Sequence, residues 1–177
     1  MNGTDFSRKV SVVLPVYNEA PNLKPLHEEL SAMAKTVPDV SFQFLFVDDG
    51  SRDGSLSVLR DLSKADARVG VIAFGRNFGQ TAAMSCGMQR ASGDIIIPMD
   101  ADRQNDPADI PRLLAKLDEG FDCVSGWRRR RKDALFLRKV PSWIANAIIS
   151  RFTGVPLHDY GCSLKAYRSD IIKHVEL

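Results

Sequence analysis

The sequence predicts an α/β domain in which helices cover both faces of a mostly parallel sheet. Short β-branched runs alternate with stretches of helical periodicity along residues 10–126. The connections between them are short, as expected where strands and helices alternate in one parallel sheet. With 177 residues, of which 44% are hydrophobic, the chain is long enough to form one core without a disulfide or a metal.

Two strands and two helices are expected in the first part of the chain. Residues 10–16 form a short β-branched run that is typical of a buried strand. Pro21 then opens a helix to about residue 36, in which apolar residues recur at helical spacing. Residues 42–47 are the second expected strand, and a helix from 53 to about 66 follows.

The alternation continues to residue 126 and then stops. Strands are expected at 69–74, 95–99 and 122–126, and helices at 79–91 and from Asp106 onward. Pro107 fits the first turn of that last helix, where its missing N–H costs nothing. The remaining residues predict an amphipathic helix near 138–152, and then a turn with a short strand within 159–168.

The charge distribution is uneven although the formal net charge is only +2. Residues 1–124 carry 13 basic and 18 acidic side chains, whereas residues 125–177 carry 11 basic and 4 acidic ones. The basic part, with a run of cations at 128–132, is suited to an anionic partner such as phosphate or a lipid headgroup. The run at 128–132 has no interleaved aromatic residues, and there is no recognised nucleic-acid fold, so no nucleic-acid partner is expected.

Several classes of protein are disfavoured. The three cysteines are far apart without a CxxC pair, which argues against a disulfide scaffold and a structural zinc site. His27 and His174 are expected at the surface. No dinucleotide fingerprint, P-loop or nucleophile elbow is present. There is no run of about 20 apolar residues, so no membrane span is predicted within this sequence. The abrupt end at Leu177 suggests a truncated chain from which transmembrane helices could be missing, and a natural end is the alternative.

Two carboxylates stand two positions apart at the end of the expected strand 95–99, in Asp100-Ala101-Asp102. Together they can meet one hard divalent cation, which keeps waters and takes its other ligands from substrate phosphates. Gln104 adds a neutral oxygen ligand. The alternative is that this segment only caps a helix, because Asp102 and Asp106 both precede one.

Two further strand ends carry polar side chains. Asp48 and Asp49 offer acceptor oxygens to a base or a ribose; the alternative is an ordinary Asx turn. Tyr17 offers a flat face for a nucleobase, and Asn18 and Glu19 offer polar contacts; the alternative is a helix entry capped by Asn18. Ligands of such sheets bind beyond the carboxyl ends of the strands, so these side chains are expected to share one site.

The order and spacing of PVYNE, DDGS and DAD with Gln104 resemble glycosyltransferase family 2 over essentially the whole chain. The segments GRNFGQ and DYGCSLKAYR are similar to the branch of this family that transfers sugars to polyprenyl phosphates. That branch includes dolichol-phosphate mannose synthases, bactoprenol glucosyltransferases and undecaprenyl-phosphate aminoarabinose transferases. The resemblance implies a GT-A (Rossmann-like) fold, a UDP- or GDP-linked sugar donor, Mg²⁺ or Mn²⁺ as cofactor, and work at the cytoplasmic face of the membrane.

The same resemblance implies roles for individual residues. The residues expected to line the nucleotide-sugar are Pro15, Tyr17, Asn18, Glu19, Asp48, Asp49, Asn77, Asp100 and Ala101. Those expected to hold the metal are Asp100, Asp102 and Gln104. Those expected to act in catalysis are Asp102, Asp159, Arg128 and Arg131.

The resulting prediction is a single catalytic domain over residues 1–177, with a donor-binding part at 1–126 and a basic, membrane-proximal acceptor part at 127–177. The expected reaction is metal-dependent, inverting transfer of a sugar from a nucleotide-sugar to a polyprenyl phosphate. A glycan or other alcohol acceptor, or a binding module without turnover, remains an alternative. The QxxRW motif of processive synthases is missing, so polymerisation is disfavoured. An oligomer is possible, and the sequence does not define its state.

Overall fold

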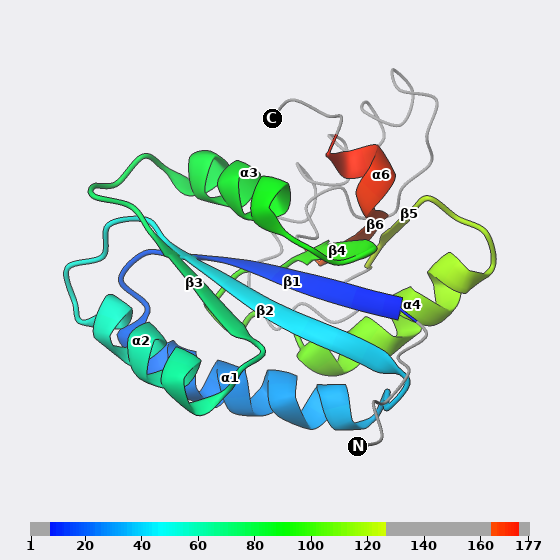
Figure 1. The fold of residues 1–177 in the computed structure, drawn as a ribbon, viewed down its shortest axis with the longest axis horizontal. Helices are drawn as coiled ribbons and strands as arrows, with labels where there is room; N and C mark the ends of the chain where they lie inside the picture. Colours follow the sequence, from blue (N-terminus) through cyan, green and yellow to red (C-terminus); the bar gives the residue numbers. More distant parts are fainter. Residues whose placement is uncertain (1–7, 127–163, 174–177) are drawn as a thin grey trace, which may run out of the picture.

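The computed structural model describes residues 8–126 and 164–173, and within them it shows a six-stranded sheet in the order β3-β2-β1-β4-β6-β5 (Figure 1). The strands are β1 (Arg8–Val16), β2 (Val40–Asp48), β3 (Val69–Ala73), β4 (Ile95–Pro98), β5 (Cys123–Ser125) and β6 (Lys165–Arg168). The helices are α1 (Ala20–Lys35), α2 (Ser55–Ala65), α3 (Gln80–Arg90), α4 (Ile110–Asp118) and α6 (Ser169–Ile172), and a 3₁₀ turn, η1 (Pro107–Asp109), precedes α4.

The sheet is mostly parallel, as the sequence predicts. β1 pairs in parallel with both β2 and β4, and β2 pairs in parallel with β3. Only β6 is antiparallel to its neighbours, β4 and β5. The chain moves from β1 outward to β3 on one side and then returns to β4 on the other, so the strand order reverses between β1 and β4. In an open α/β sheet such a reversal is where a ligand crevice forms.

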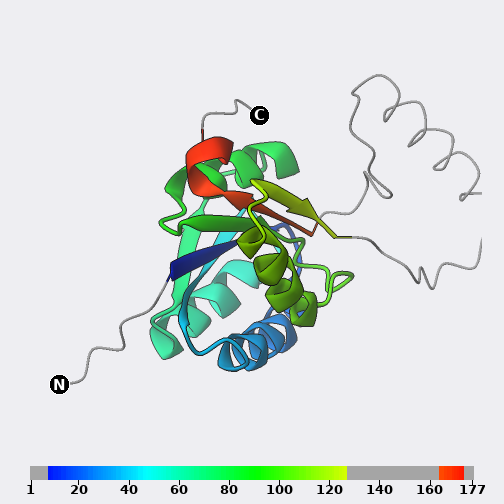
Figure 2. The ribbon, with the colours of Figure 1, turned by 90° about the vertical axis from the view of Figure 1, so that its right-hand side faces the viewer.

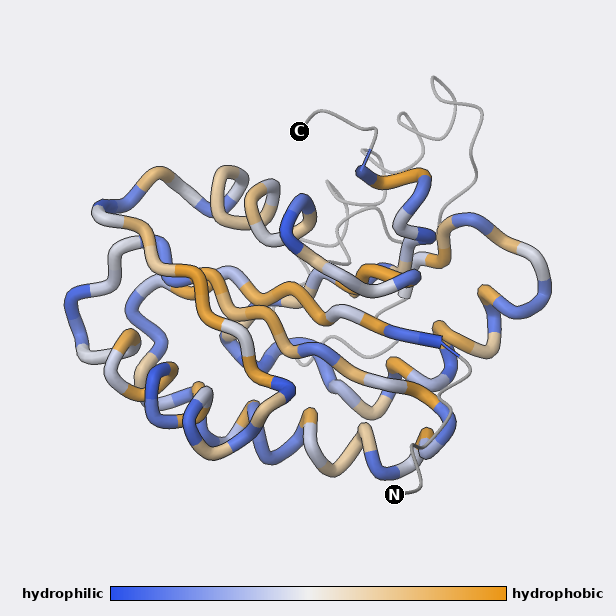
Figure 3. The backbone as a smooth tube through the Cα atoms, viewed as in Figure 1, coloured by the Kyte–Doolittle hydropathy of each residue, from blue (hydrophilic) through white to orange (hydrophobic). Residues whose placement is uncertain are grey.

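Side chains alternate along the strands and supply two cores, one on each face. The larger core lies between the sheet and α1, α2 and α4, where Phe44 and Phe46 are fully buried. The smaller one lies under α3 and α6 and contains Val13, Leu45 and Ile96. Figures 1 and 2 show these helices on opposite faces, and Figure 3 shows the hydrophobic strands between more polar helix surfaces.

Helix α3 packs against the sheet at a glycine that faces the strands. A Cβ atom added at Gly87 would come within 2.4 Å of Val13 Cγ1 and 3.0 Å of Val47 Cγ2. The missing side chain therefore sets the separation between α3 and strands β1 and β2.

One sequence expectation about this fold is wrong. His27 was expected at the surface, but its side chain is only 16% exposed and its Nε2 lies 2.8 Å from Asp66 Oδ2. Its ring also meets Phe44 edge-on, with centroids 6.4 Å apart. The α1 periodicity places His27 beside the buried stripe, and only the α2–β3 connection supplies the carboxylate that makes this position favourable for it.

The predicted elements that fall on described residues agree with the structure to within a few residues at their ends, including the short strand that ends at Arg168. Within the described ranges, no helix is long and apolar enough to cross a bilayer. The predicted helix at 138–152 lies outside the described residues, as do His158 and His174.

Candidate functional site

Four loops gather at the carboxyl edge of the parallel strands, the left-hand edge of the sheet in Figure 1. They follow β1, β2, β3 and β4, and they carry the residues that the sequence singles out. Parallel pairing is what brings them to one edge, although they are up to about 80 residues apart in sequence.

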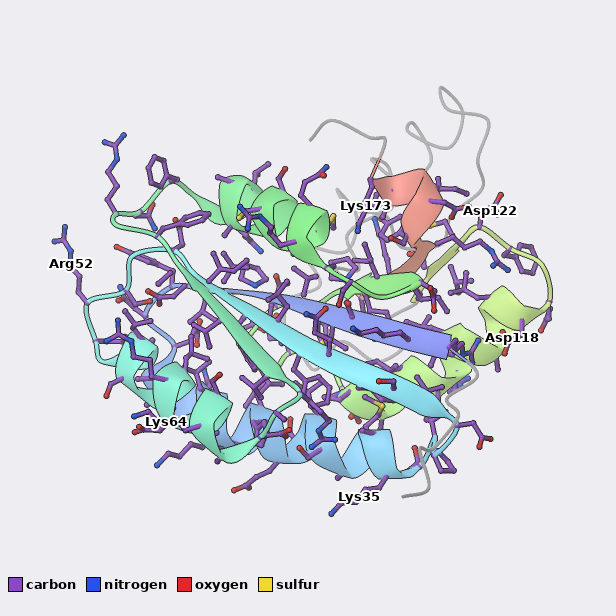
Figure 4. All side chains as sticks on the ribbon, in the orientation of Figure 1. Lys35, Arg52, Lys64, Asp118, Asp122 and Lys173 are labelled. Carbon is purple, nitrogen blue, oxygen red and sulfur yellow. The ribbon has the colours of Figure 1, made fainter. Side chains whose placement is uncertain are left out.

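The loops after β1 and β2 are joined by reciprocal hydrogen bonds. The Asn18 N–H donates to Ser51 Oγ over 3.0 Å, and the Arg52 N–H donates to Asn18 Oδ1 over 2.8 Å. Asn18 has a φ of 59°, a left-handed conformation that asparagine tolerates better than most residues. Arg52 itself points outward at the loop tip (Figure 4). The suggestion that Asn18 caps α1 is wrong, because the cap position is Glu19 and has no side-chain cap bond.

A second set of bonds ties the start of α1 to the start of α2. The Glu19 N–H donates to Ser55 Oγ over 2.9 Å, and the Ala20 N–H donates to Asp53 Oδ2 over 3.0 Å. Burial opposes ionisation of Asp53, but hydrogen bonds from the Ser55 hydroxyl and from backbone N–H groups outweigh it and lower its pKa. Tyr17, just before these ties, is 46% exposed and presents its ring at the edge.

The two neighbouring aspartates after β2 differ in what they contact. Asp49 Oδ1 accepts from the Phe78 N–H (2.7 Å), and its Oδ2 accepts from the Gly79 N–H and the Asn77 side chain (both 2.9 Å). Asp49 therefore anchors the loop after β3. Asp48 Oδ2 accepts from the Ser51 N–H at 3.3 Å, which is the contact of an Asx-type turn.

The other oxygen of Asp48 lacks a partner. Asp48 is 1% exposed, and its Oδ1 has no hydrogen bond from any described residue. A buried acceptor without a donor costs stability, so such atoms are retained where a ligand or water satisfies them. An N–H of a nucleobase has the required chemistry.

Gly50 allows the loops after β2 and β3 to touch. Its φ is +70°, and a Cβ there would lie 2.5 Å from the carbonyl carbon of Arg76. Both the backbone conformation and the close approach require glycine.

The two carboxylates after β4 are each held through one oxygen. Asp100 Oδ1 accepts from Gln80 Nε2 over 2.7 Å, and Asp102 Oδ1 accepts from the Gln104 N–H over 3.0 Å. Helix capping is done by Asp106 instead, whose side chain accepts from the Ala108 N–H. The second oxygens of Asp100 and Asp102 have no hydrogen-bond partner among the described residues.

This donor set fits a magnesium-like cation that shares its coordination with phosphates, since such ions use one or two carboxylates. Among the described residues, no cluster of three or more His, Cys, Asp or Glu side chains is placed to hold a metal ion. The side chain of Gln104 is exposed beside them.

Sequence reasoning missed two residues here. Gln80 lies within the GRNFGQ segment, from which only Asn77 was selected. Arg103, between Asp102 and Gln104, has a φ of 61° and bonds through its guanidinium to Glu29 of α1. The position at a strand end indicates the carboxylates from sequence, but Gln80, which donates to Asp100, comes from another element of the fold.

The remaining predicted site residues divide into two groups. Pro15 and Ala101 are buried, and the Glu19 carboxylate accepts a hydrogen bond from the Asn22 side chain. Arg128, Arg131 and Asp159 lie outside the described residues.

A mostly parallel sheet with acidic loops at its strand-order reversal is an open α/β domain, a class whose ligands bind at that edge. The chain belongs to glycosyl transferase family 2, whose profile matches residues 11–176. Solved structures share the fold: glucosyl-3-phosphoglycerate synthase from Mycobacterium tuberculosis, in complex with Mn²⁺, UDP and phosphoglyceric acid, superposes with a TM-score of 0.70 at 19% identity. That match covers 93% of this chain and 57% of that one, and it confirms the predicted GT-A fold.

Two curated relatives are much more similar in sequence. The dodecaprenyl-phosphate galacturonate synthase of Rhizobium johnstonii is 47% identical over 97% of this chain. The undecaprenyl-phosphate 4-deoxy-4-formamido-L-arabinose transferase of Salmonella paratyphi A is 47% identical over 93% of it. The chain spans about half of each relative, 51% and 50% respectively.

Proposed function

We propose that this protein transfers a sugar from a nucleotide-sugar to a polyprenyl phosphate. The observation that carries the proposal is the 47% identity, over almost the whole chain, to two relatives named for sugar transfer to such lipid phosphates. Action as a peripheral protein at the cytoplasmic face of the membrane is part of the proposal.

The donor is assigned to residues 1–126. Tyr17 supplies an exposed ring for the base, and Asp48 supplies a buried acceptor for a base N–H. Asp100 and Asp102, aided by Gln104, would hold Mg²⁺ or Mn²⁺. When bound, this ion neutralises charge on the leaving nucleoside diphosphate.

The acceptor is assigned to residues 127–177, which contain Arg128, Arg131 and Asp159. A phosphate monoester has a second pKa of about 6 and is largely dianionic at pH 7, so it needs no general base. Its oxygen attacks the anomeric carbon, the bond from that carbon to the diphosphate oxygen breaks, and the configuration inverts. Arginine can orient the attacking phosphate through paired N–H donors, while Asp159 orients the acceptor or an arginine.

A product assay tests this function. The purified protein is incubated with UDP- and GDP-linked sugars and Mn²⁺ or Mg²⁺, with undecaprenyl phosphate or a plain alcohol as acceptor. Glycolipid formation that EDTA abolishes is the expected result. A better yield with the alcohol would replace the lipid-phosphate proposal by the alcohol alternative, and donor binding without turnover would favour a binding module.

Single substitutions test the acceptor part. Arg128→Ala or Arg131→Ala should raise the KM for polyprenyl phosphate by about tenfold or more, as expected for loss of a charge-assisted hydrogen bond. Asp159→Asn should retain more activity than loss of an obligatory base would allow. Unchanged acceptor kinetics in both arginine variants would contradict this assignment.

A further inference from the structure

We propose that Gln80 is a positioning residue that orients the Asp100 carboxylate for the metal and the donor. The inference rests on the proposed function, because it assigns Asp100 to the donor-binding machinery. Neither the family match nor the names of the relatives select Gln80.

The contact has a defined chemical direction. Gln80 is the first residue of α3, and its Nε2 donates to Asp100 Oδ1 over 2.7 Å. A hydrogen bond to a carboxylate is charge-assisted and stronger than one between neutral groups. Because it occupies Oδ1, the Oδ2 atom is left to meet a ligand, and rotation of the carboxylate would break the bond.

Gln80 is itself held in place from the opposite side of the site. Asp49 accepts the N–H groups of Phe78 and Gly79, the two residues that lead into α3. Gly50 lets the same loop approach the end of β2. The contacts therefore run from the end of β2, through the β3–α3 loop, to Gln80 and on to Asp100 at the end of β4.

Asp102 is oriented in a different way. Its Oδ1 accepts the N–H of Gln104, two residues further along the same loop. Asp102 therefore keeps its support wherever α3 lies, whereas the Gln80 contact to Asp100 depends on α3. The orientation of the Asp100 carboxylate relative to Asp102 thus depends on α3, through the contact that Gln80 makes.

Removing this contact should weaken the metal site without unfolding the protein. Gln80 is exposed and lies at the end of a helix, so Gln80→Ala creates no buried cavity. Loss of a residue that orients a metal ligand typically lowers metal affinity by about 10–100-fold. Gln80→Glu keeps the side-chain length but replaces the donor by an acceptor, and it should also fail to orient Asp100.

The experiment measures Mn²⁺ binding by electron paramagnetic resonance, with UDP and with GDP present, and melting temperature by circular dichroism. Gln89→Ala is the matched control, because Gln89 is an exposed glutamine on the same helix whose side-chain contact is with the Lys173 carbonyl. We expect a Mn²⁺ dissociation constant at least about tenfold higher in both Gln80 variants and unchanged in Gln89→Ala, with similar melting temperatures.

The outcomes separate the inference from the proposed function. If the wild-type protein binds Mn²⁺ with a nucleotide and the Gln80 variants bind it equally well, the positioning role is overturned and the proposed function stands. A lower melting temperature with unchanged Mn²⁺ affinity identifies a structural role and also overturns it. If the wild-type protein binds no Mn²⁺ with either nucleotide, the proposed function fails and the inference fails with it.

Discussion

At the scale of single residues, Asp48 combines a structural cost with an expected benefit for binding. Its Oδ1 is buried without a partner in the described part of the chain. Asp48→Asn removes the buried charge, so we expect a melting temperature that is equal or higher, together with nucleotide affinity that is weaker by about tenfold or more. Thermal melting and calorimetric titration with UDP and GDP measure both quantities.

Asp49 is the natural comparison, because its carboxylate accepts three hydrogen bonds from the loop after β3. In Asp49→Asn, an amide nitrogen replaces either Oδ1, which accepts one of these hydrogen bonds, or Oδ2, which accepts the other two. It should therefore destabilise the fold by about 1–3 kcal/mol. Equal effects of the two substitutions on stability would contradict the distinction drawn between these aspartates.

Asp66 makes the acid stability of the fold testable. The Arg68 guanidinium, with the Arg68 N–H and the His27 ring, holds the pKa of Asp66 well below its usual range despite partial burial. Near pH 3–4 the unfolded chain therefore binds more protons at this position than the folded chain. The contribution of Asp66 to the free energy of unfolding is complete above its pKa in the unfolded chain, about 3.9. It is lost as the pH falls toward the lower pKa of the folded state.

Asp66→Asn should accordingly flatten the dependence of melting temperature on pH as the pH falls from about 5 toward 2. Asp61→Asn is the control, because the Asp61 side chain is 70% exposed and pairs with Lys64 only at 3.7 Å. A curve for Asp66→Asn that parallels the wild-type curve over this range would refute the assignment.

At the scale of elements, the packing of α3 depends on Gly87. In Gly87→Ala, crowding against Val13 and Val47 should lower the free energy of unfolding by about 1–3 kcal/mol. The better helix propensity of alanine should raise it by up to about 1 kcal/mol. The net loss should lower the melting temperature by roughly 2–4 °C per kcal/mol. Gly75→Ala, where a Cβ would meet nothing within 4 Å, should cause no loss. A stabilised Gly87→Ala variant would show that α3 can move away from the sheet freely.

At the scale of the whole molecule, the uneven charge distribution provides a test of the proposed membrane association. Each basic residue near an anionic surface contributes about 1 kcal/mol. Replacing residues 128–132 by glutamine should therefore abolish flotation with vesicles that contain phosphatidylglycerol at low salt. Binding of the wild-type protein should also weaken as salt rises.

The control removes five basic residues from exposed helical positions elsewhere, two of which, Lys35 and Lys64, point outward from α1 and α2 in Figure 4. The five are Lys24, Lys35, Arg60, Lys64 and Arg112. Equal loss of vesicle binding in both variants would indicate a response to net charge alone and would contradict a membrane-facing role for 128–132.

The sequence by itself determined the elements, the parallel class of the sheet and the edge at which Asp48, Asp100 and Asp102 lie. Those properties follow from local signals, since β-branched runs, helical periodicity and strand ends are each written in a few consecutive residues. Only the tertiary structure decided which carboxylates already accept hydrogen bonds from other parts of the protein. Asp48 and Asp49 are adjacent and chemically identical, yet the loop after β3 occupies Asp49 and leaves Asp48 Oδ1 without a partner. Likewise Gln80 reaches Asp100 because α3 begins at the same edge of the sheet at which β4 ends. The physical reason is that hydrogen-bond partners are set by distance in space, which no local pattern specifies.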